Sequence, residues 1–184
     1  MDLPHSLPPL VIMGVSGTGK TAAGRQVAAL LKVAFIDGDD LHSPANKAKM
    51  HAGIPLNDAD RIPWLRSIAV ELARTPPPLV ACSALKRSYR DLLRAMAPST
   101  FFIHLDGPAS VITEHLAKRS HEFMSPTLLQ SQLATLEPLE PDEAHMVVSI
   151  EQPLTEVCRT IVDRLPHHLA ALTRPSPTLD DEDA

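Results

Sequence analysis

Apolar and polar positions along the chain alternate between two kinds of segment. Short runs of about strand length are apolar at successive positions, as in strands covered by helices on both faces. Longer segments between them carry apolar residues at helical spacing, as Thr21–Lys32 does. The predicted strands are Leu10–Gly14, Val33–Asp37, Leu79–Ala84, Thr100–Asp106 and Met146–Ile150. This alternation predicts a parallel α/β fold.

The predicted helices show where the alternation is interrupted. They are Thr21–Lys32, a helix opened by Ser43 and Pro44 and closed by Gly53, Asp58–Arg74, Lys86–Ala97, Pro108–Lys118, Pro126–Leu136 and Leu154–Leu165. Two of them lie in an insertion at about residues 40–76, and a polar, basic segment at about 118–126 interrupts the later helices. Both segments start near the carboxyl edge of the sheet, where ligands bind in such folds. We therefore expect one domain over residues 1–172, with an acidic, Pro-rich and disordered tail at 173–184.

Composition narrows the class of protein. The hydrophobic share of 44%, the charged share of 21% and the net charge of −5 are those of a globular protein, and they argue against a nucleic-acid-binding surface. The two cysteines, Cys82 and Cys158, show no metal-ligand or disulfide spacing. No apolar stretch has membrane-spanning length, and the N-terminus lacks signal-peptide features. A cytoplasmic location is therefore expected.

The strongest motif is the P-loop Gly14-Val15-Ser16-Gly17-Thr18-Gly19-Lys20-Thr21, which follows a predicted strand and opens a predicted helix. Its glycines let successive backbone N–H groups turn toward a phosphate, and the helix N-terminus adds partial positive charge. Lys20 is expected to reach the β- and γ-phosphates of ATP, and the Thr21 hydroxyl to bind Mg²⁺. The motif predicts nucleotide binding but does not separate kinases from other P-loop proteins.

An acidic cluster follows the second predicted strand. Strand alternation would place Asp37 and Asp39 on one side and Asp40 on the other. One carboxylate could orient water on Mg²⁺ while another accepts a proton from an attacking hydroxyl. A solvated acidic turn is the alternative interpretation.

Cationic and amide residues come after this cluster. Asn46 and Lys49 share one face of the predicted insertion helix, which could hydrogen-bond a polyol and neutralise a carboxylate. Arg61, Lys86 and Arg90 lie near helix N-termini, where the helix dipole disfavours cations, and this indicates an anionic partner.

Sequence blocks across most of the chain identify it as resembling the gluconokinase family, thermoresistant type, within the shikimate-kinase-like P-loop kinases. Apart from the P-loop, the blocks are Asp37–Asn46, Lys49–Met50, Gly53–Leu56, Asp60–Leu65, Ala81–Arg94 and Ser131–Glu137. The resemblance implies a five-stranded parallel sheet, a mobile lid and a homodimer. It also implies ATP-dependent phosphorylation of the 6-hydroxyl of D-gluconate, which feeds 6-phosphogluconate into central metabolism through the pentose phosphate pathway.

The resemblance also implies roles for individual residues. Asp39 would be the catalytic base and Asp37 would organise Mg²⁺. Acceptor binding would fall to Arg61, Lys86 and Arg90, with polyol contacts from His42, Asn46 and Gln132. Arg119 would approach the transferring phosphoryl group from the lid. The family's lid pattern Arg-x-Gly-His-Phe is altered here to Arg119-Ser120-His121-Glu122-Phe123, without the glycine. Gln152 and Pro153 resemble a loop that borders adenine.

Two other functions are compatible with the residues alone. One is a kinase of another small hydroxylated acid or polyol, such as shikimate, or of a nucleotide, because an acidic cluster beside basic residues suits any hydroxylated anion. The other is a non-catalytic nucleotide-binding regulator, which would not need the acidic cluster and the lid arginine together. The blocks of the resemblance favour the gluconate kinase.

Overall fold

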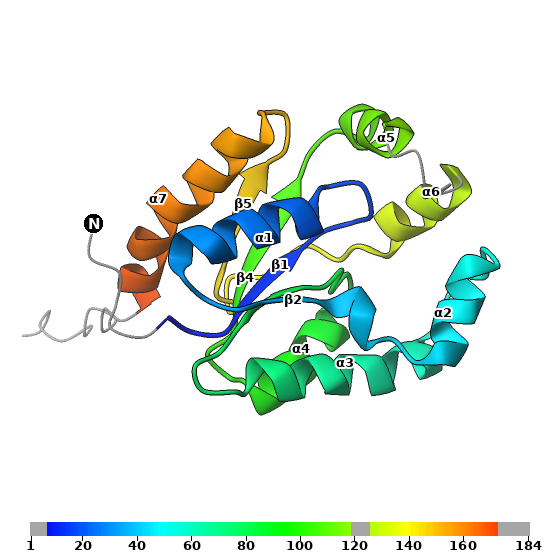
Figure 1. Ribbon diagram of the computed structural model, residues 1–184, viewed down its shortest axis with the longest axis horizontal. Coiled ribbons are helices and arrows are strands. Elements are labelled where there is room, and N and C mark those ends of the chain that lie inside the picture. The colour runs from blue at the N-terminus through cyan, green and yellow to red at the C-terminus, as the bar shows by residue number, and fades with distance from the viewer. Residues whose placement is uncertain (1–6, 119–125, 173–184) are drawn as a thin grey trace, which may run out of the picture.

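A five-stranded parallel sheet forms the centre of the protein (Figure 1). The computed structural model describes residues 7–118 and 126–172. The strand order is β2-β3-β1-β4-β5, and every pair of neighbours is parallel. The strands are β1 (Leu10–Met13), β2 (Phe35–Asp37), β3 (Leu79–Ala81), β4 (Phe101–Asp106) and β5 (His145–Ser149). The predicted α/β class and the five-stranded parallel sheet are confirmed.

Helices cover both faces of this sheet and make three layers (Figure 1). On one face α1 packs with α7 around a core that includes Val27, Ile103 and Ile161. On the other face α3 packs with α4 around Val11, Leu65 and Phe102. The helices are α1 (Lys20–Leu31), α2 (Pro44–His51), α3 (Asp58–Leu72), α4 (Arg87–Met96), α5 (Ala109–Ala117), α6 (Pro126–Thr135) and α7 (Leu154–Leu172).

Local sequence fixes the helix starts in the insertion. The Ser43 hydroxyl accepts a hydrogen bond from the Asn46 backbone N–H, and Pro44 occupies the first turn of α2. Helix α3 begins with a capping box, in which Asn57 and Asp60 each accept from the other's backbone N–H. These caps fix the direction in which α2 and α3 leave the carboxyl edge of the sheet.

Two predicted elements differ from the observed ones. Helix α7 was expected to end at Leu165, yet it continues through Pro166 to Leu172 because its buried apolar stripe extends to Leu169. The strand before the acidic cluster stops at Asp37, and Gly38–Leu41 form a 3₁₀ turn, η1. The alternation assumed for Asp39 and Asp40 is therefore wrong.

Gly38 explains why the chain turns at this point. A Cβ atom at Gly38 would lie 2.3 Å from the Ala81 carbonyl oxygen, so the chain passes too close to β3 for any other residue. The Gly38 carbonyl also accepts a hydrogen bond of 2.6 Å from the Trp64 indole.

No helix in the described part of the chain is long and apolar enough to cross a membrane.

Candidate active site

The P-loop connects β1 to α1 at the carboxyl edge of the sheet. Gly17 and Gly19 adopt positive φ angles of 90° and 87°, which only glycine tolerates readily. A Cβ atom at Gly17 would lie 2.8 Å from the Leu116 side chain, so the loop also packs closely against α5. Helix α1 has no side-chain cap at Gly19. The loop thus places the positive end of the α1 dipole where the motif predicts an anion.

Thr21 and Asp37 meet at the base of this loop. The Thr21 hydroxyl donates a hydrogen bond of 2.8 Å to the Asp37 carboxylate, so the two residues predicted to bind the metal are brought together. Mg²⁺ in kinases takes one or two protein oxygen ligands beside phosphate oxygens and water. A hydroxyl and a carboxylate at this distance fit that donor set.

A cavity of about 270 Å³ lies beside the P-loop and α7. It is lined by Gly17, Thr18 and Gly19 on one side and by Gln152 and Pro153 on the other. The predicted nucleotide residues from the two ends of the chain therefore share one cavity. Its lining combines the P-loop glycines with the apolar residues Ile150 and Val157, which suits a purine ring beside phosphates.

His115 and Lys118 also line this nucleotide cavity, although the sequence interpretation did not include them. The His115 ring nitrogen Nδ1 lies 3.2 Å from the Gly17 carbonyl oxygen. Both residues come from the end of α5, which no motif marks. Their place in the cavity follows from the packing of α5 against the P-loop, which the sequence alone does not predict.

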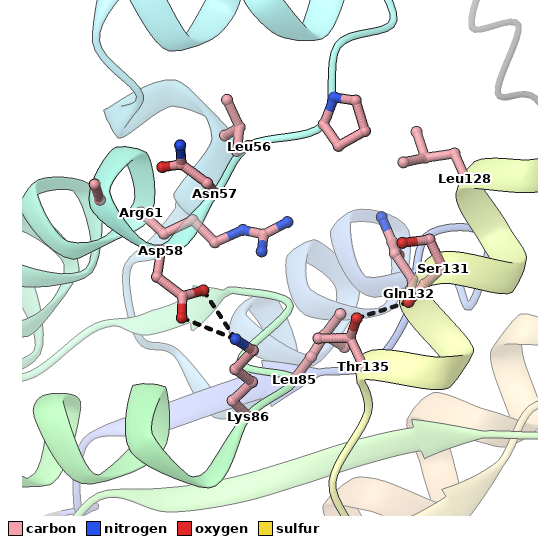
Figure 2. Close-up of a pocket in the computed structure, with 12 residues that line it drawn as sticks. Leu56, Asn57, Asp58, Arg61, Leu85, Lys86, Leu128, Ser131, Gln132 and Thr135 are labelled. Atoms are coloured by element: carbon pink, nitrogen blue, oxygen red, sulfur yellow. Dashed lines mark hydrogen bonds and ion pairs between the residues drawn. The ribbon is translucent and has the colours of Figure 1, made fainter.

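A second cavity, of about 530 Å³, lies between α3, α4 and α6 (Figure 2). We call it the acceptor cavity. Figure 2 shows the Arg61 guanidinium extending into it from α3, while Lys86 faces Asp58. Its lining residues are Pro55, Leu56, Asn57, Asp58, Ala59, Arg61, Leu85, Lys86, Leu128, Ser131, Gln132 and Thr135.

Gln132 joins the acceptor cavity to the P-loop. Its side-chain oxygen accepts a hydrogen bond of 2.7 Å from the Ser16 backbone N–H, and its amide nitrogen donates to the Ser16 hydroxyl at 3.1 Å. The same residue lines the acceptor cavity. A side chain predicted to contact a polyol thus also holds the loop predicted to bind the phosphates.

His42 belongs to the insertion rather than to the acceptor cavity. Its ring is buried and stacks on Trp64 with centroids 4.2 Å apart. Burial, followed by the charges of Lys47 and Arg61, lowers the pKa of His42 to about 4. The ring is therefore neutral at neutral pH. Its Nε2 atom lies 4.0 Å from an Asp39 carboxylate oxygen, so the ring stands next to the exposed acidic turn.

Asn46 and Lys49 likewise bind the protein itself in this structure. The Asn46 amide donates to the Asp60 carbonyl oxygen at 2.8 Å, and Lys49 pairs with the Asp60 carboxylate at 2.6 Å. Neither residue lines the acceptor cavity. The face that they share joins α2 to α3, and this corrects their interpretation as a free polyol-binding face.

Arg90 requires the clearest correction. Its side chain is fully buried, and it forms a two-bond ion pair with the equally buried Glu143, at 2.6 and 2.9 Å. Its remaining donors bind the backbone carbonyls of Ala84, Leu85, Glu137 and Pro138. The anion that this basic residue required is therefore Glu143. No N–H donor of Arg90 is left to bind an acceptor substrate.

Asp58 and Tyr89 are further residues of the site that sequence reasoning missed. Lys86 donates to both Asp58 oxygens at 2.9 Å. Tyr89 donates its hydroxyl to the same carboxylate and accepts a hydrogen bond of 3.3 Å from Arg61. The sequence pattern assigns Asp58 only to the start of a predicted helix. Its position one residue after a capping residue and three before Arg61 was the available signal.

Arg119, His121 and Glu122, predicted for the lid, lie outside the described residues, as does the tail from residue 173. Among the residues that the structure describes, no group of three or more His, Cys, Asp or Glu side chains could hold a metal ion. The Thr21–Asp37 pair is the candidate that the P-loop motif predicts.

A P-loop at the carboxyl edge of a five-stranded parallel sheet, with a nucleotide cavity on one side and a polar acceptor cavity on the other, defines a small-molecule P-loop kinase. A sequence model of the shikimate kinase family matches residues 16–166. A shikimate kinase structure from Acinetobacter baumannii has a TM-score of 0.60 at 17% identity, covering 91% of this chain and 96% of that one. This likeness concerns the fold.

Within that class, several similar proteins at more than 40% identity are gluconokinases. The thermosensitive gluconokinase of Escherichia coli K12 is 43% identical over 160 residues, which are 83% of this chain and 86% of that protein. The crystal structure of a gluconokinase from Sinorhizobium meliloti 1021 has a TM-score of 0.83 at 44% identity, covering 91% of this chain and 98% of that one. The chain belongs to the gluconokinase family.

Proposed function

We propose that the protein is a gluconokinase, which transfers the γ-phosphoryl group of ATP to the 6-hydroxyl of D-gluconate and gives 6-phospho-D-gluconate and ADP. The observation that carries the proposal is the P-loop itself, which lines the nucleotide cavity and is hydrogen-bonded to Gln132 of the acceptor cavity. The family relationship supplies the identity of the acceptor.

The donor half of the reaction rests on the P-loop. Backbone N–H groups from Gly17 to Thr21 and the Lys20 ammonium would hold the phosphates of ATP. Thr21 and Asp37 would hold Mg²⁺. The ion held there would supply positive charge that offsets the negative charge developing on the phosphates. The nucleotide cavity lined by Gln152 and Pro153 would take the base.

The acceptor half rests on the cations of the acceptor cavity. Arg61 would bind the carboxylate of gluconate, Lys86, which pairs with Asp58, would add positive charge to the same cavity, and Gln132 would hydrogen-bond a hydroxyl near the P-loop. Asp39 would accept the proton of the 6-hydroxyl. As this proton moves to Asp39, the oxygen–phosphorus bond forms and the bond between the γ-phosphorus and the bridging oxygen breaks, leaving ADP. The expected role of Arg119 at the phosphoryl group remains a prediction.

An ADP-release assay with Mg-ATP tests the proposal directly. D-gluconate, shikimate, glucose and nucleoside monophosphates are compared as acceptors, and we expect turnover selective for gluconate. Asp39→Asn should lower kcat by roughly 100-fold while ATP binding stays largely intact, because the base is lost but the P-loop is not. Turnover selective for another acceptor would contradict the proposed substrate. A kcat for Asp39→Asn within a few-fold of wild type would remove Asp39 from the base role.

A further inference from the structure

Three charged side chains line the acceptor cavity among the described residues: Asp58, Arg61 and Lys86. The cavity therefore carries two positive charges and one negative charge, a net charge of +1. The two cations were expected for an anionic acceptor. The carboxylate was not, because it shares the cavity with the anion that the cations are expected to bind.

The Asp58 carboxylate is fixed at this position. It is the first residue of α3, whose start is set by the capping box of Asn57 and Asp60 and does not use the Asp58 side chain. Both Asp58 oxygens accept from Lys86, and the Tyr89 hydroxyl donates to one of them. The hydrogen bond from Tyr89, followed by those from Lys86, lowers the pKa of Asp58, so the carboxylate is charged at neutral pH.

Tyr89 makes this arrangement rigid. Only 5% of Tyr89 is exposed, and its ring packs in the core between α3 and α4. Its hydroxyl accepts from Arg61 at 3.3 Å while it donates to Asp58. One buried hydroxyl thus sets the positions of a cation and an anion in the same cavity. The guanidinium of Arg61 extends into the open part of the cavity, and Lys86 faces Asp58 (Figure 2).

The charge balance has a consequence for the ligand. One carboxylate on an acceptor neutralises the net charge of +1, with Arg61 as its accessible partner. A second charge near the first would face Asp58, which already occupies Lys86. Two unit charges about 4 Å apart in water interact by an energy equivalent to about a fivefold change in an equilibrium constant. Asp58 therefore disfavours a dianion by at least this order.

We propose that Asp58 is a specificity-determining residue, which restricts the acceptor cavity to acids with a single negative charge by occupying Lys86 with a resident carboxylate. This inference rests on the proposed function only in taking the cavity as the acceptor site. It goes further because it names the charge class that the cavity rejects and the residue that rejects it.

The experiment compares the binding of a matched pair of small acids by titration calorimetry. Glycerate carries one carboxylate, and tartronate replaces its terminal hydroxymethyl group with a second carboxylate. In the wild-type protein we expect glycerate to bind more tightly than tartronate. In Asp58→Asn, which keeps the side-chain shape, we expect the ratio of the two dissociation constants to shift toward tartronate by about fivefold or more.

Two variants separate charge from other effects. Glu71→Gln removes one negative charge from the far end of the same helix, where Glu71 pairs with Arg74, and should leave the ratio unchanged. Asp58→Glu keeps the charge and should keep the wild-type preference. An unchanged ratio in Asp58→Asn, or an equal shift in Glu71→Gln, would overturn the proposal.

D-gluconate is titrated in parallel so that the two proposals fail separately. If wild-type protein binds glycerate but not gluconate, the proposed substrate is contradicted while the charge selection is still measured. If gluconate binds and the glycerate-to-tartronate ratio does not respond to Asp58→Asn, the specificity role of Asp58 is contradicted and the proposed function stands.

Discussion

Two ion pairs at the start of α4 have cations that are four residues apart in the sequence. Both join a basic side chain to a carboxylate, but they differ in their exposure to solvent. Lys86 pairs with Asp58 at the acceptor cavity, where 30% of the Lys86 and 57% of the Asp58 side chain are exposed. Arg90 pairs with Glu143 where neither side chain has any exposure. The first pair can exchange its partners with water or a ligand. The second cannot, because every donor of Arg90 is already taken inside the protein.

The comparison teaches that the same sequence signal has two physical outcomes. Both cations lie at a helix N-terminus near the carboxyl edge of the sheet, and both were expected to bind the acceptor. Arg90 instead connects the β3–α4 segment to the chain after α6, through the carbonyls of Leu85 and Glu137. The Arg90–Glu143 pair supports the shape of the acceptor cavity, and the Lys86–Asp58 pair contributes to its charge.

The largest effect should come from breaking the buried pair. Glu143→Ala leaves the Arg90 guanidinium charged and without its carboxylate, and should lower the free energy of unfolding by about 3–5 kcal/mol. Urea denaturation followed by circular dichroism measures this change. Asp142→Ala is the matched control, since Asp142 makes an exposed pair with Arg87 and should cost less than about 1 kcal/mol. Equal losses in the two variants would contradict the distinction.

The buried pair also predicts a direction for the pH dependence. Burial alone would raise the pKa of Glu143, but the hydrogen bonds and charge of Arg90 outweigh it and the net pKa is lowered. The stabilisation is therefore present above the unfolded-state pKa of Glu and is lost as the pH falls through the lower folded-state value. Arg90→Met combined with Glu143→Leu should remove this contribution, so the urea midpoint of the double variant should vary less with pH between about 3 and 6 than that of the wild type.

Breaking the exposed Lys86–Asp58 pair should affect substrate binding more than stability. Lys86→Met should change the free energy of unfolding by no more than about 1 kcal/mol, because surface ion pairs contribute little. It should raise the KM for gluconate about fivefold or more, because the acceptor cavity loses a positive charge while the Asp58 carboxylate stays beside the bound anion. The KM for ATP should stay within about twofold, since Lys86 does not line the nucleotide cavity. A gluconate KM equal to that of wild type would exclude Lys86 from the acceptor site.

The smallest expected effect comes from salt. Raising ionic strength from about 0.05 to about 0.5 M should increase the gluconate KM of the wild type a few-fold, because the cations of the acceptor cavity are screened. In Lys86→Met this dependence should be shallower. The stability difference between wild type and Glu143→Ala should not respond, because a pair without exposure is screened little. A salt-dependent stability difference would show that the buried pair is hydrated.

The fold and the donor site could be predicted from the sequence because their signals are local. Five apolar runs gave the five strands, and the P-loop carried its own glycines, lysine and threonine in one stretch. The Thr21–Asp37 pair was also predictable, since the carboxyl ends of parallel strands meet at one edge. These inferences need only periodicity and motif chemistry.

The acceptor site was harder because its partners are distant in the sequence. Glu143 lies 53 residues after Arg90, and nothing near Arg90 shows that its anion is internal. Asp58 and Tyr89 lie 31 residues apart, and their contact depends on how α3 packs against α4. Strand alternation failed at Asp39 because Gly38 fits against β3 and lets the chain turn. Local patterns report helices and loops, but not which charges neutralise one another.

The two hydrogen bonds between Gln132 and Ser16 make the binding of the two substrates interdependent. A phosphate that takes the Ser16 backbone N–H competes with the Gln132 oxygen, and an acceptor that takes the Gln132 amide competes with Ser16. Each substrate then alters the work needed to admit the other. Thermodynamic linkage makes this influence reciprocal, so the factor by which ATP changes the affinity for the acceptor equals the factor by which the acceptor changes the affinity for ATP. One glutamine side chain would thus couple the affinities of the two substrates without favouring either order of binding.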